Sequence, residues 1–215
     1  MSNEVKDQEM NKLKGFIESR DYESAYQWIE SQETHDHLKS YHKAYVLFNE
    51  GKLAEARSIL EGLKVNGLYS KEVNAGIKQI KDKLELKYIE QEYSKADKFT
   101  LTSASLPHLF YPMLSALLGV LFLTLLIKNK KLISVIVLFL SLIPAGIYYR
   151  VNSFQVEINL EEVTIYRGPS KIFESLQVLP IGTRFIVTKE VKDWKYIEFP
   201  SIFQGWVHKN KAIKQ

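Results

Sequence analysis

The residues of this sequence best suited to recognition chemistry are aromatic side chains close to its C-terminus. Tyr166, Trp194, Tyr196 and Trp206 come from neighbouring alternating segments. Aromatic rings offer large amphipathic contact area to extended ligands, so we expect these four residues to line a partner-binding groove. The alternative for Trp194 and Trp206 is a role in packing, as partly buried residues of a small domain.

Three histidines suggest a metal site, but their surroundings do not support one. His35 and His42 are seven residues apart, so one helix face could present both, with His37 between them. No carboxylate–histidine pattern of the metalloprotease kind accompanies them. We expect solvated histidines near the start of a helix, and no metal or cofactor.

The sequence offers no catalytic set either. It has no cysteine, P-loop or glycine-rich dinucleotide turn, and no Ser/His/Asp arrangement in a recognisable context. We therefore expect a protein that is not an enzyme and has no catalytic residues.

Short alternating strands must position the aromatic residues. From Val156 onward apolar and polar residues alternate, and turn residues such as Gly168-Pro169 and Gly182-Thr183 separate the segments. This pattern predicts a small closed β-barrel.

Two uncharged apolar runs precede these strands. Residues 109–127 and 132–149 contain no Asp, Glu, Lys, Arg or His, and only Lys128, Asn129, Lys130 and Lys131 separate them. At ~1.5 Å per residue each run is close to the thickness of a bilayer core. They predict a transmembrane helical hairpin. The alternative is a pair of buried helices in a large soluble domain, which rarely lack polar residues on every face.

The N-terminal part reads as consecutive helices with an internal repeat. The segment Leu13–Ile29 is similar to Ala44–Leu60 at a spacing of 31 residues. The second copy, with Ala44, Gly51 and Ala56, resembles the tetratricopeptide repeat. The first copy departs from it, with Leu13 for the small residue and Arg20 for the turn glycine. A third helix, residues 70–94, is expected to cap the stack, and the aromatic residues here are expected to pack in the core rather than bind a peptide.

The C-terminal part resembles the bacterial SH3 domain. The matching features are an apolar strand, a Gly-Pro-Ser loop, a Gly-Thr turn, a second apolar strand, a turn before Trp, and a closing Gly-Trp-Val; they fall at Val163–Ile165, Gly168–Ser170, Gly182-Thr183, Phe185–Val187, Asp193-Trp194 and Gly205–Val207. This sequence has Thr164 and Tyr166 where that family often has Asn and Arg.

The complete order of segments resembles the E-type proteins of the bacterial aerotolerance (Bat) operon. The resemblance implies a non-catalytic adaptor in cell-envelope assembly or stress tolerance. Its implied partners are von Willebrand A-domain membrane proteins and a MoxR-type AAA+ ATPase system. That family usually has a signal peptide, whereas residues 1–15 of this sequence lack the apolar segment of one.

We therefore expect a multidomain α + β protein in four segments. These are a tetratricopeptide-like helical domain (1–98), a linker (99–108), a transmembrane hairpin (109–149) and an SH3-like β-barrel domain (150–215). Residues 1–98 carry 16 basic and 18 acidic side chains, and residues 150–215 carry 10 and 7, so neither part suggests a nucleic-acid partner.

The lysine turn predicts the orientation in the membrane. Basic turns favour the cytoplasmic side, which would place both soluble parts in the periplasm or outside a bacterial inner membrane. The leading hypothesis is an envelope scaffold that binds protein partners. A cell-wall sensor whose SH3-like domain binds peptidoglycan is the alternative, and a membrane enzyme or transport subunit is a third.

Overall fold

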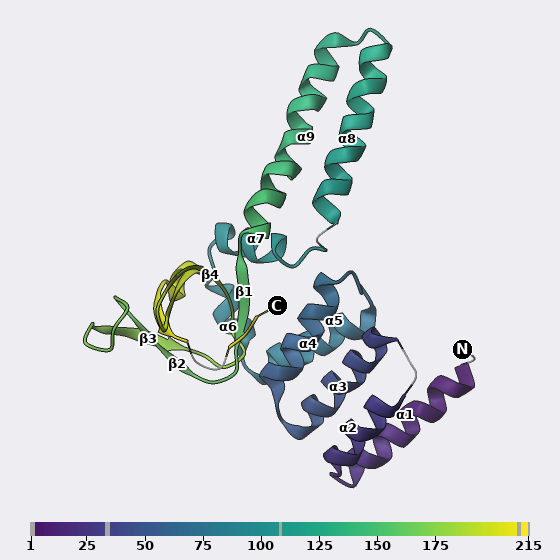
Figure 1. Cartoon of the computed structure of the whole chain (residues 1–215), viewed down its shortest axis with the longest axis vertical. Coiled ribbons are helices and arrows are strands. Elements are labelled where there is room, and N and C mark those ends of the chain that lie inside the picture. Colours follow the sequence, from purple (N-terminus) through teal and green to yellow (C-terminus); the bar gives the residue numbers. More distant parts are fainter. Residues whose placement is uncertain (1–2, 33–34, 108, 210–211, 215) are drawn as a thin grey trace.

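The computed structural model describes residues 3–32, 35–107, 109–209 and 212–214 of the 215-residue chain. It has a helical N-terminal half, an apolar helical hairpin and a C-terminal antiparallel sheet (Figure 1). The helices are α1 (Asn3–Glu18), α2 (Tyr22–Ser31), α3 (Asp36–Glu50), α4 (Leu53–Val65), α5 (Lys71–Lys83), α6 (Leu86–Gln91), α7 (Lys95–Ser103), α8 (Phe110–Ile127), α9 (Lys131–Asn152) and the 3₁₀ turn η1 (Ser201–Phe203). The strands are β1 (Gln155–Asn159), β2 (Val163–Tyr166), β3 (Ser175–Leu179), β4 (Arg184–Val191), β5 (Trp194–Phe199), β6 (Gly205–His208) and β7 (Ala212–Lys214).

Helices α1 to α5 form a helical stack of successive antiparallel pairs. Its packing uses the small residues of the repeat, because Ala44 and Ala56 are buried where α3 and α4 meet. Gly51 ends α3 in the left-handed region, at φ 89°. Arg20 adopts the same hand, with φ 59°, at the equivalent turn of the first copy. The helical content is thus consistent with the expected repeats.

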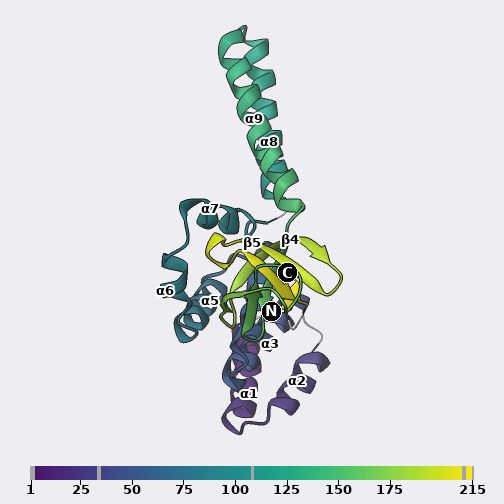
Figure 2. The same cartoon turned by 90° about the vertical axis from the view of Figure 1, so that its left-hand side faces the viewer.

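The expected third helix, residues 70–94, is two helices. α5 ends at Lys83, and Glu85 then takes a left-handed conformation, φ 55°, before α6 begins. The break redirects the chain from the helical stack toward the sheet, and α6 and α7 continue beside it (Figure 2). The expected linker, residues 99–108, therefore begins inside α7.

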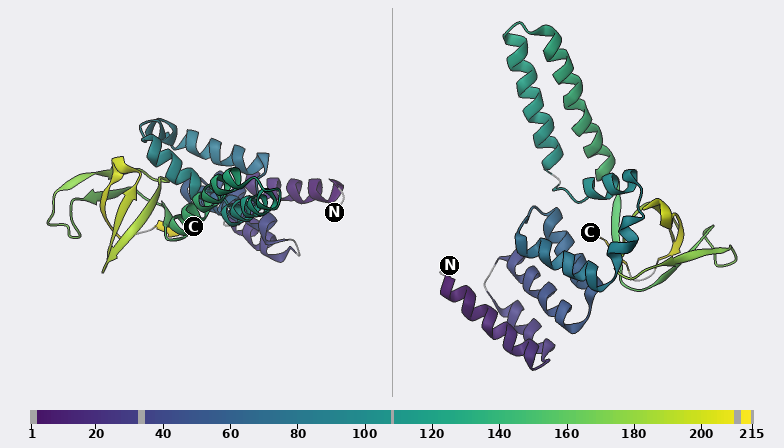
Figure 3. Two further views of the ribbon diagram at one scale, coloured as in Figure 1. Left: turned by 90° about the horizontal axis from the view of Figure 1, so that it is seen from above. Right: turned by 180° about the vertical axis from the view of Figure 1, so that it is seen from behind.

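Helices α8 and α9 form an apolar hairpin that projects away from the rest of the protein (Figure 3). Both are long and apolar enough to cross a membrane. In α8 only Tyr111 is buried among the described residues, so the structure does not pack this helix as a core helix. Large apolar side chains of this hairpin such as Leu117, Leu132 and Phe139 are more than 65% exposed.

The two apolar helices contact each other through small polar residues. Ser134 and Ser141 of α9 are buried, and the Ser115 hydroxyl donates to the Ser141 carbonyl at 2.9 Å. Gly119 and Gly146 have no neighbouring atom where a side chain would begin, so they do not mediate this approach. α9 runs to Asn152, and Pro144 lies inside this helix.

The sheet has the strand order β3-β2-β6-β5-β4-β1-β7, and all its pairs are antiparallel. Within the described residues β3 and β7 remain its two edges. The sheet is thus not closed, and the structure shows an open sheet where we expected a barrel.

Helices α6 and α7 cover the core side of the open sheet. Tyr93, from the turn between α6 and α7, is 7% exposed and packs with Ile165, Phe185 and Ile197. Ile89 and Leu101 lie against the same cluster. Burial raises the pKa of the Tyr93 phenol. The segment before the apolar hairpin therefore completes the core of the segment after it.

Polar contacts fasten these two segments together. The Asp97 carboxylate accepts hydrogen bonds from the backbone N–H of Ser201 at 2.9 Å and from its hydroxyl at 2.7 Å. The same carboxylate closes the capping box of α7 with Ser94. Arg57 of α4 donates to the Gly182 carbonyl at 2.8 Å, across 125 residues of sequence.

Gly182 suits this contact for two reasons. Its φ of 75° belongs to the left-handed region. A Cβ at this position would also lie 2.5 Å from a methyl carbon of Leu84, so the turn before β4 fits closely against the helical stack.

Candidate functional site

The four aromatic residues expected to bind a partner lie together on one face of the sheet. Tyr166 is on β2, Trp194 and Tyr196 are on β5, and Trp206 is on β6. We call these four side chains the aromatic face. β6 lies between β2 and β5, and it pairs Trp206 with Tyr166 on one side and with Tyr196 on the other. The strand register thus explains why residues distant in sequence become neighbours.

Alternation along each strand explains why this face is turned away from the core. Ile165, Ile197 and Val207 are at most 4% exposed and point into the cluster covered by α6 and α7. Successive side chains of a strand point to opposite faces, so their neighbours Tyr166, Tyr196 and Trp206 point outward. All four aromatic residues are half-buried.

Ring contacts hold the aromatic face in a fixed arrangement. The Tyr166 and Trp194 ring centroids lie 5.5 Å apart with the rings perpendicular, and those of Tyr196 and Trp206 lie 5.2 Å apart. Such edge-to-face and tilted pairs are the favoured aromatic geometries. Each residue therefore packs and presents surface at once, so the packing and binding interpretations of Trp194 and Trp206 are compatible.

Two residues missed in the sequence extend this face. His208 pairs with Trp194 across the strands, and the centroids of their rings lie 5.3 Å apart. Lys189 of β4 places its Nζ 5.6 Å from the centre of the Tyr196 ring, within cation–π range. The alternation Trp206-Val207-His208 is the signal that could have predicted His208. The bulges in the β4–β5 pairing hide the register of Lys189 from the sequence.

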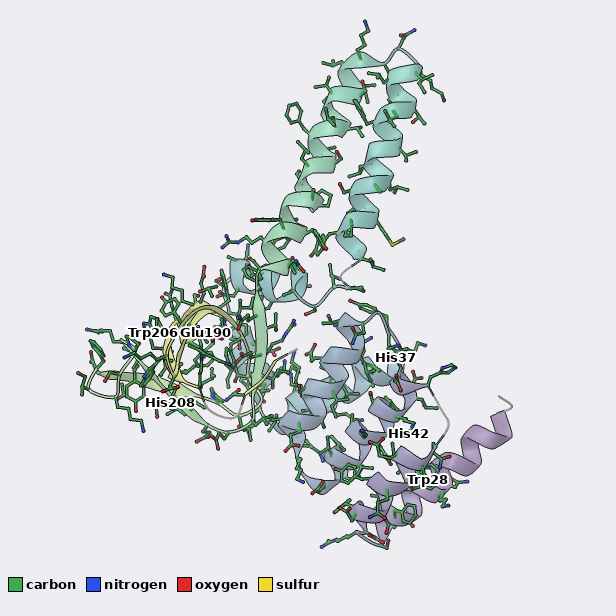
Figure 4. All side chains as sticks on the ribbon, in the orientation of Figure 1. Trp28, His37, His42, Glu190, Trp206 and His208 are labelled. Carbon is green, nitrogen blue, oxygen red and sulfur yellow. The ribbon has the colours of Figure 1, made fainter. Side chains whose placement is uncertain are left out.

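The histidines considered as metal ligands lie elsewhere, in the helical stack. His35 precedes the first residue of α3. His42 lies inside α3, is 5% exposed and stacks near Trp28 with ring centroids 6.4 Å apart, so the expectation of a solvated histidine is wrong for this residue. Figure 4 shows His37, His42 and Trp28 on the helices and Trp206 and His208 on the sheet. No group of three or more His, Asp or Glu side chains among the described residues could hold a metal ion.

The aromatic face has side chains suited to non-covalent contact with a ligand. It combines rigid rings, the nearby cation of Lys189 and the outer surface of three paired strands. The neighbouring hairpin of β2 and β3 adds exposed apolar side chains, since Ile172 is 90% and Val178 is 50% exposed. Exposed apolar surface of this kind is typical of contact sites.

No protein-family model, no curated protein and no solved structure matches this chain.

Proposed function

We propose that this protein is a non-catalytic adaptor, anchored in a membrane by α8 and α9, that binds protein partners through its aromatic face. The observation behind the proposal is the outward-facing set of Tyr166, Trp194, Tyr196 and Trp206 on a sheet whose other face is already packed. Rigid aromatic side chains are the commonest energetic anchors of protein interfaces. Because α6 and α7 occupy the inner face, the outer one is free for a partner.

The anchoring is supported by contacts between the segment that precedes the apolar hairpin and the segment that follows it. The helical stack and the sheet meet at one end of the hairpin through Arg57 and Gly182 (Figure 1). Two helices that return the chain to the side it started from are what such a contact requires. We propose a multi-pass protein of the bacterial inner membrane, with the lysine turn in the cytoplasm and both soluble parts outside it.

The resemblance to the E-type proteins of the bacterial aerotolerance operon extends the proposal to an envelope complex. Its partners would be von Willebrand A-domain membrane proteins and a MoxR-type AAA+ ATPase system. By the same resemblance, the sheet would correspond to a bacterial SH3-like domain and the helical stack to tetratricopeptide-like repeats.

A crosslinking experiment on the full chain in native membranes tests the proposal. A photoreactive phenylalanine derivative at Lys189 would lie beside the Tyr196 ring and report any protein bound to the aromatic face. We expect one discrete crosslinked product, and we expect the additional change Tyr166→Ala with Tyr196→Ala to reduce its yield about tenfold or more. The matched control is Tyr88→Ala, because this tyrosine is 70% exposed on α6, away from the face.

The outcomes separate the proposal from its alternatives. A product that survives the double tyrosine change, in a protein that still unfolds cooperatively, would place recognition elsewhere, with the helical stack as the next candidate. The cell-wall hypothesis is tested with purified peptidoglycan sacculi. Sedimentation of the wild type, but not of the double variant, with sacculi would assign the aromatic face to peptidoglycan instead of protein.

A further inference from the structure

A cavity between the helical stack and the sheet is lined by charged side chains that no sequence motif predicted to meet. This cavity of about 480 Å³ is bounded by α4, α5, the α6–α7 segment and the start of β4. Its charged side chains are five basic and two acidic residues: Arg57, Lys64, Lys81, Lys98 and Arg184, with Glu61 and Glu90. The described walls thus carry a surplus of three positive charges.

The two acidic residues form ion pairs with Arg57 and Lys81, two of the five cations of the cavity. Glu61 lies 3.5 Å from an Arg57 Nη2. Glu90 lies 3.3 Å from the same nitrogen and also pairs with Lys81. Burial disfavours the charged form of Glu61, but Arg184 and Arg57 outweigh this and hold its pKa below the ordinary range. Glu61 is therefore ionised, and its charge is shared among these cations.

Arg184 is the cation left without an anion in contact. It is 6% exposed, and its guanidinium donates to the carbonyls of Leu101 and Ala104 at 3.1 Å each and to the hydroxyl of Ser105. No carboxylate among the described residues lies within ion-pair distance of it. Its Nε has no hydrogen-bond partner among them either. A buried cation is costly unless an anion compensates it, and Glu61, the acidic residue that attracts Arg184, is in contact with Arg57 instead.

The rim of the cavity adds two cations that no described carboxylate pairs. The Lys64 Nζ lies 5.7 Å from the centre of the Tyr69 ring, and the Lys98 Nζ donates to the Gln91 carbonyl at 3.0 Å. Lys98 and Tyr69 are exposed, so the cavity opens to solvent on this side. An anion entering here would meet lysines first and the arginines below them.

The cavity also lies at the base of the apolar hairpin. Thr102, Ser105 and Leu106 belong to its wall and come just before α8. The Tyr111 hydroxyl of α8 donates to the Ser103 carbonyl at 3.1 Å, which ties the hairpin to this wall. If α8 and α9 cross a bilayer, the cavity opens near the depth of the lipid phosphates.

We infer that this cavity binds a phosphate-bearing anion at the junction of helical stack, sheet and hairpin. Arginine and lysine are the side chains that recognise phosphate oxygens. The driving force is the surplus of three positive charges together with buried Arg184, which has no carboxylate in contact among the described residues and shares the charge of Glu61 with Arg57. The phosphate belongs to a membrane phospholipid or to a soluble compound. The lipid source depends on the proposed anchoring, whereas the phosphate chemistry does not.

Thermal unfolding of the full-length protein in a non-ionic detergent tests the inference. Inorganic phosphate is compared with sodium chloride at equal ionic strength. In a parallel arm, nanodiscs of phosphatidylcholine alone are compared with nanodiscs that also contain phosphatidylglycerol. At roughly ten times the dissociation constant we expect phosphate, or the anionic lipid, to raise the melting temperature by about 3–6 °C.

Rim variants distinguish a site from a general charge effect. Lys64→Gln with Lys98→Gln should weaken binding about tenfold or more and lower the unliganded melting temperature only slightly, since the lysines contact the Tyr69 ring and the Gln91 carbonyl at the rim and have no ion pair among the described residues. The matched control is Lys78→Gln with Lys87→Gln, exposed lysines of α5 and α6 that do not line the cavity.

Each outcome decides something. Stabilisation by both anions supports a general phosphate site. Stabilisation by phosphatidylglycerol alone supports a lipid site, and stabilisation by phosphate alone supports a site for a soluble ligand. The inference is overturned if neither anion stabilises the protein, or if the rim and control variants respond alike. None of these outcomes depends on the aromatic face, so the inference and the proposed function can fail independently.

Discussion

At the scale of single residues, buried polar side chains decide how the parts of this protein fit together. Asp97 is 1% exposed, and its carboxylate joins the start of α7 to Ser201 of the sheet. Burial alone would raise the pKa of Asp97, but the hydrogen bonds from Ser201 and Ser94 outweigh it and hold this pKa below the ordinary value. The ionised form is thus the one that the fold stabilises.

Asp97→Asn should lower the free energy of unfolding by about 1.5–3 kcal/mol at neutral pH, because an amide NH₂ would face groups that donate to the carboxylate. A depressed pKa stabilises the fold above the unfolded-state pKa of about 3.9, and this contribution is lost as the pH falls through the folded value. Urea unfolding of the full chain at several pH values measures both effects.

The difference between wild type and Asp97→Asn should therefore be full at pH 5–7 and shrink below about pH 4. Asp193→Asn, at an exposed turn, is the control and should change the free energy of unfolding by less than about 0.5 kcal/mol. If the difference in unfolding free energy between wild type and Asp97→Asn stays constant down to about pH 3, the pKa of Asp97 is not lowered in the way described.

At the scale of elements, the conformation of single turns reveals what the repeat pattern requires. Gly51 and Arg20 end the first helix of the two copies with positive φ values of 89° and 59°. Glycine adopts this region without strain, whereas other residues pay about 1 kcal/mol or more. The poorer first copy thus keeps the turn of the repeat but not its best residue.

Gly51→Ala should lower the stability of the helical stack by about 1 kcal/mol, and Arg20→Gly should raise it by about 0.5–1 kcal/mol. Gly62→Ala, inside α4 with open space around the new methyl group, is the matched control and should stabilise by about 0.5–1 kcal/mol. Denaturant unfolding followed by helical circular dichroism measures all three. Equal effects of Gly51→Ala and Gly62→Ala would contradict the assigned turn conformation.

The elements also show how far the sequence could lead. Length and hydropathy were sufficient to predict both apolar helices, and period-two alternation predicted the strands that carry Tyr166, Trp194, Tyr196 and Trp206. The break at Glu85 was not predictable, because a glutamate in the left-handed region leaves no local signal. The open sheet was missed for a related reason: α6 and α7 cover its core, and no pattern within the C-terminal segment reveals a cover supplied from outside it.

At the scale of the whole molecule, the apolar hairpin is an insertion between two segments that fold against each other. Arg57 meets Gly182, Tyr93 enters the core of the sheet, and Arg184 donates to the carbonyl of Leu101. These contacts join residues separated by more than 70 positions, so only the folded chain brings them together. The cavity with its surplus of positive charge forms only where these two segments meet, so it could not be predicted from the sequence.

The adaptor account therefore requires both soluble parts on one side of the membrane and the lysine turn on the other. The chain contains no cysteine, so single substitutions Lys87→Cys, Lys171→Cys and Asn129→Cys, all at exposed positions, can each be labelled by a membrane-impermeant maleimide. They report α6, the β2–β3 connection and the turn of the hairpin. Spheroplasts expose one face of the membrane to the reagent and inverted vesicles expose the other.

We predict that Lys87→Cys and Lys171→Cys are labelled in spheroplasts and Asn129→Cys only in inverted vesicles. Labelling of the first two only in inverted vesicles, with Asn129→Cys in spheroplasts, would reverse the proposed orientation but keep the hairpin. Labelling of Lys87→Cys and Lys171→Cys from opposite faces, or of all three from the same face, would contradict the account.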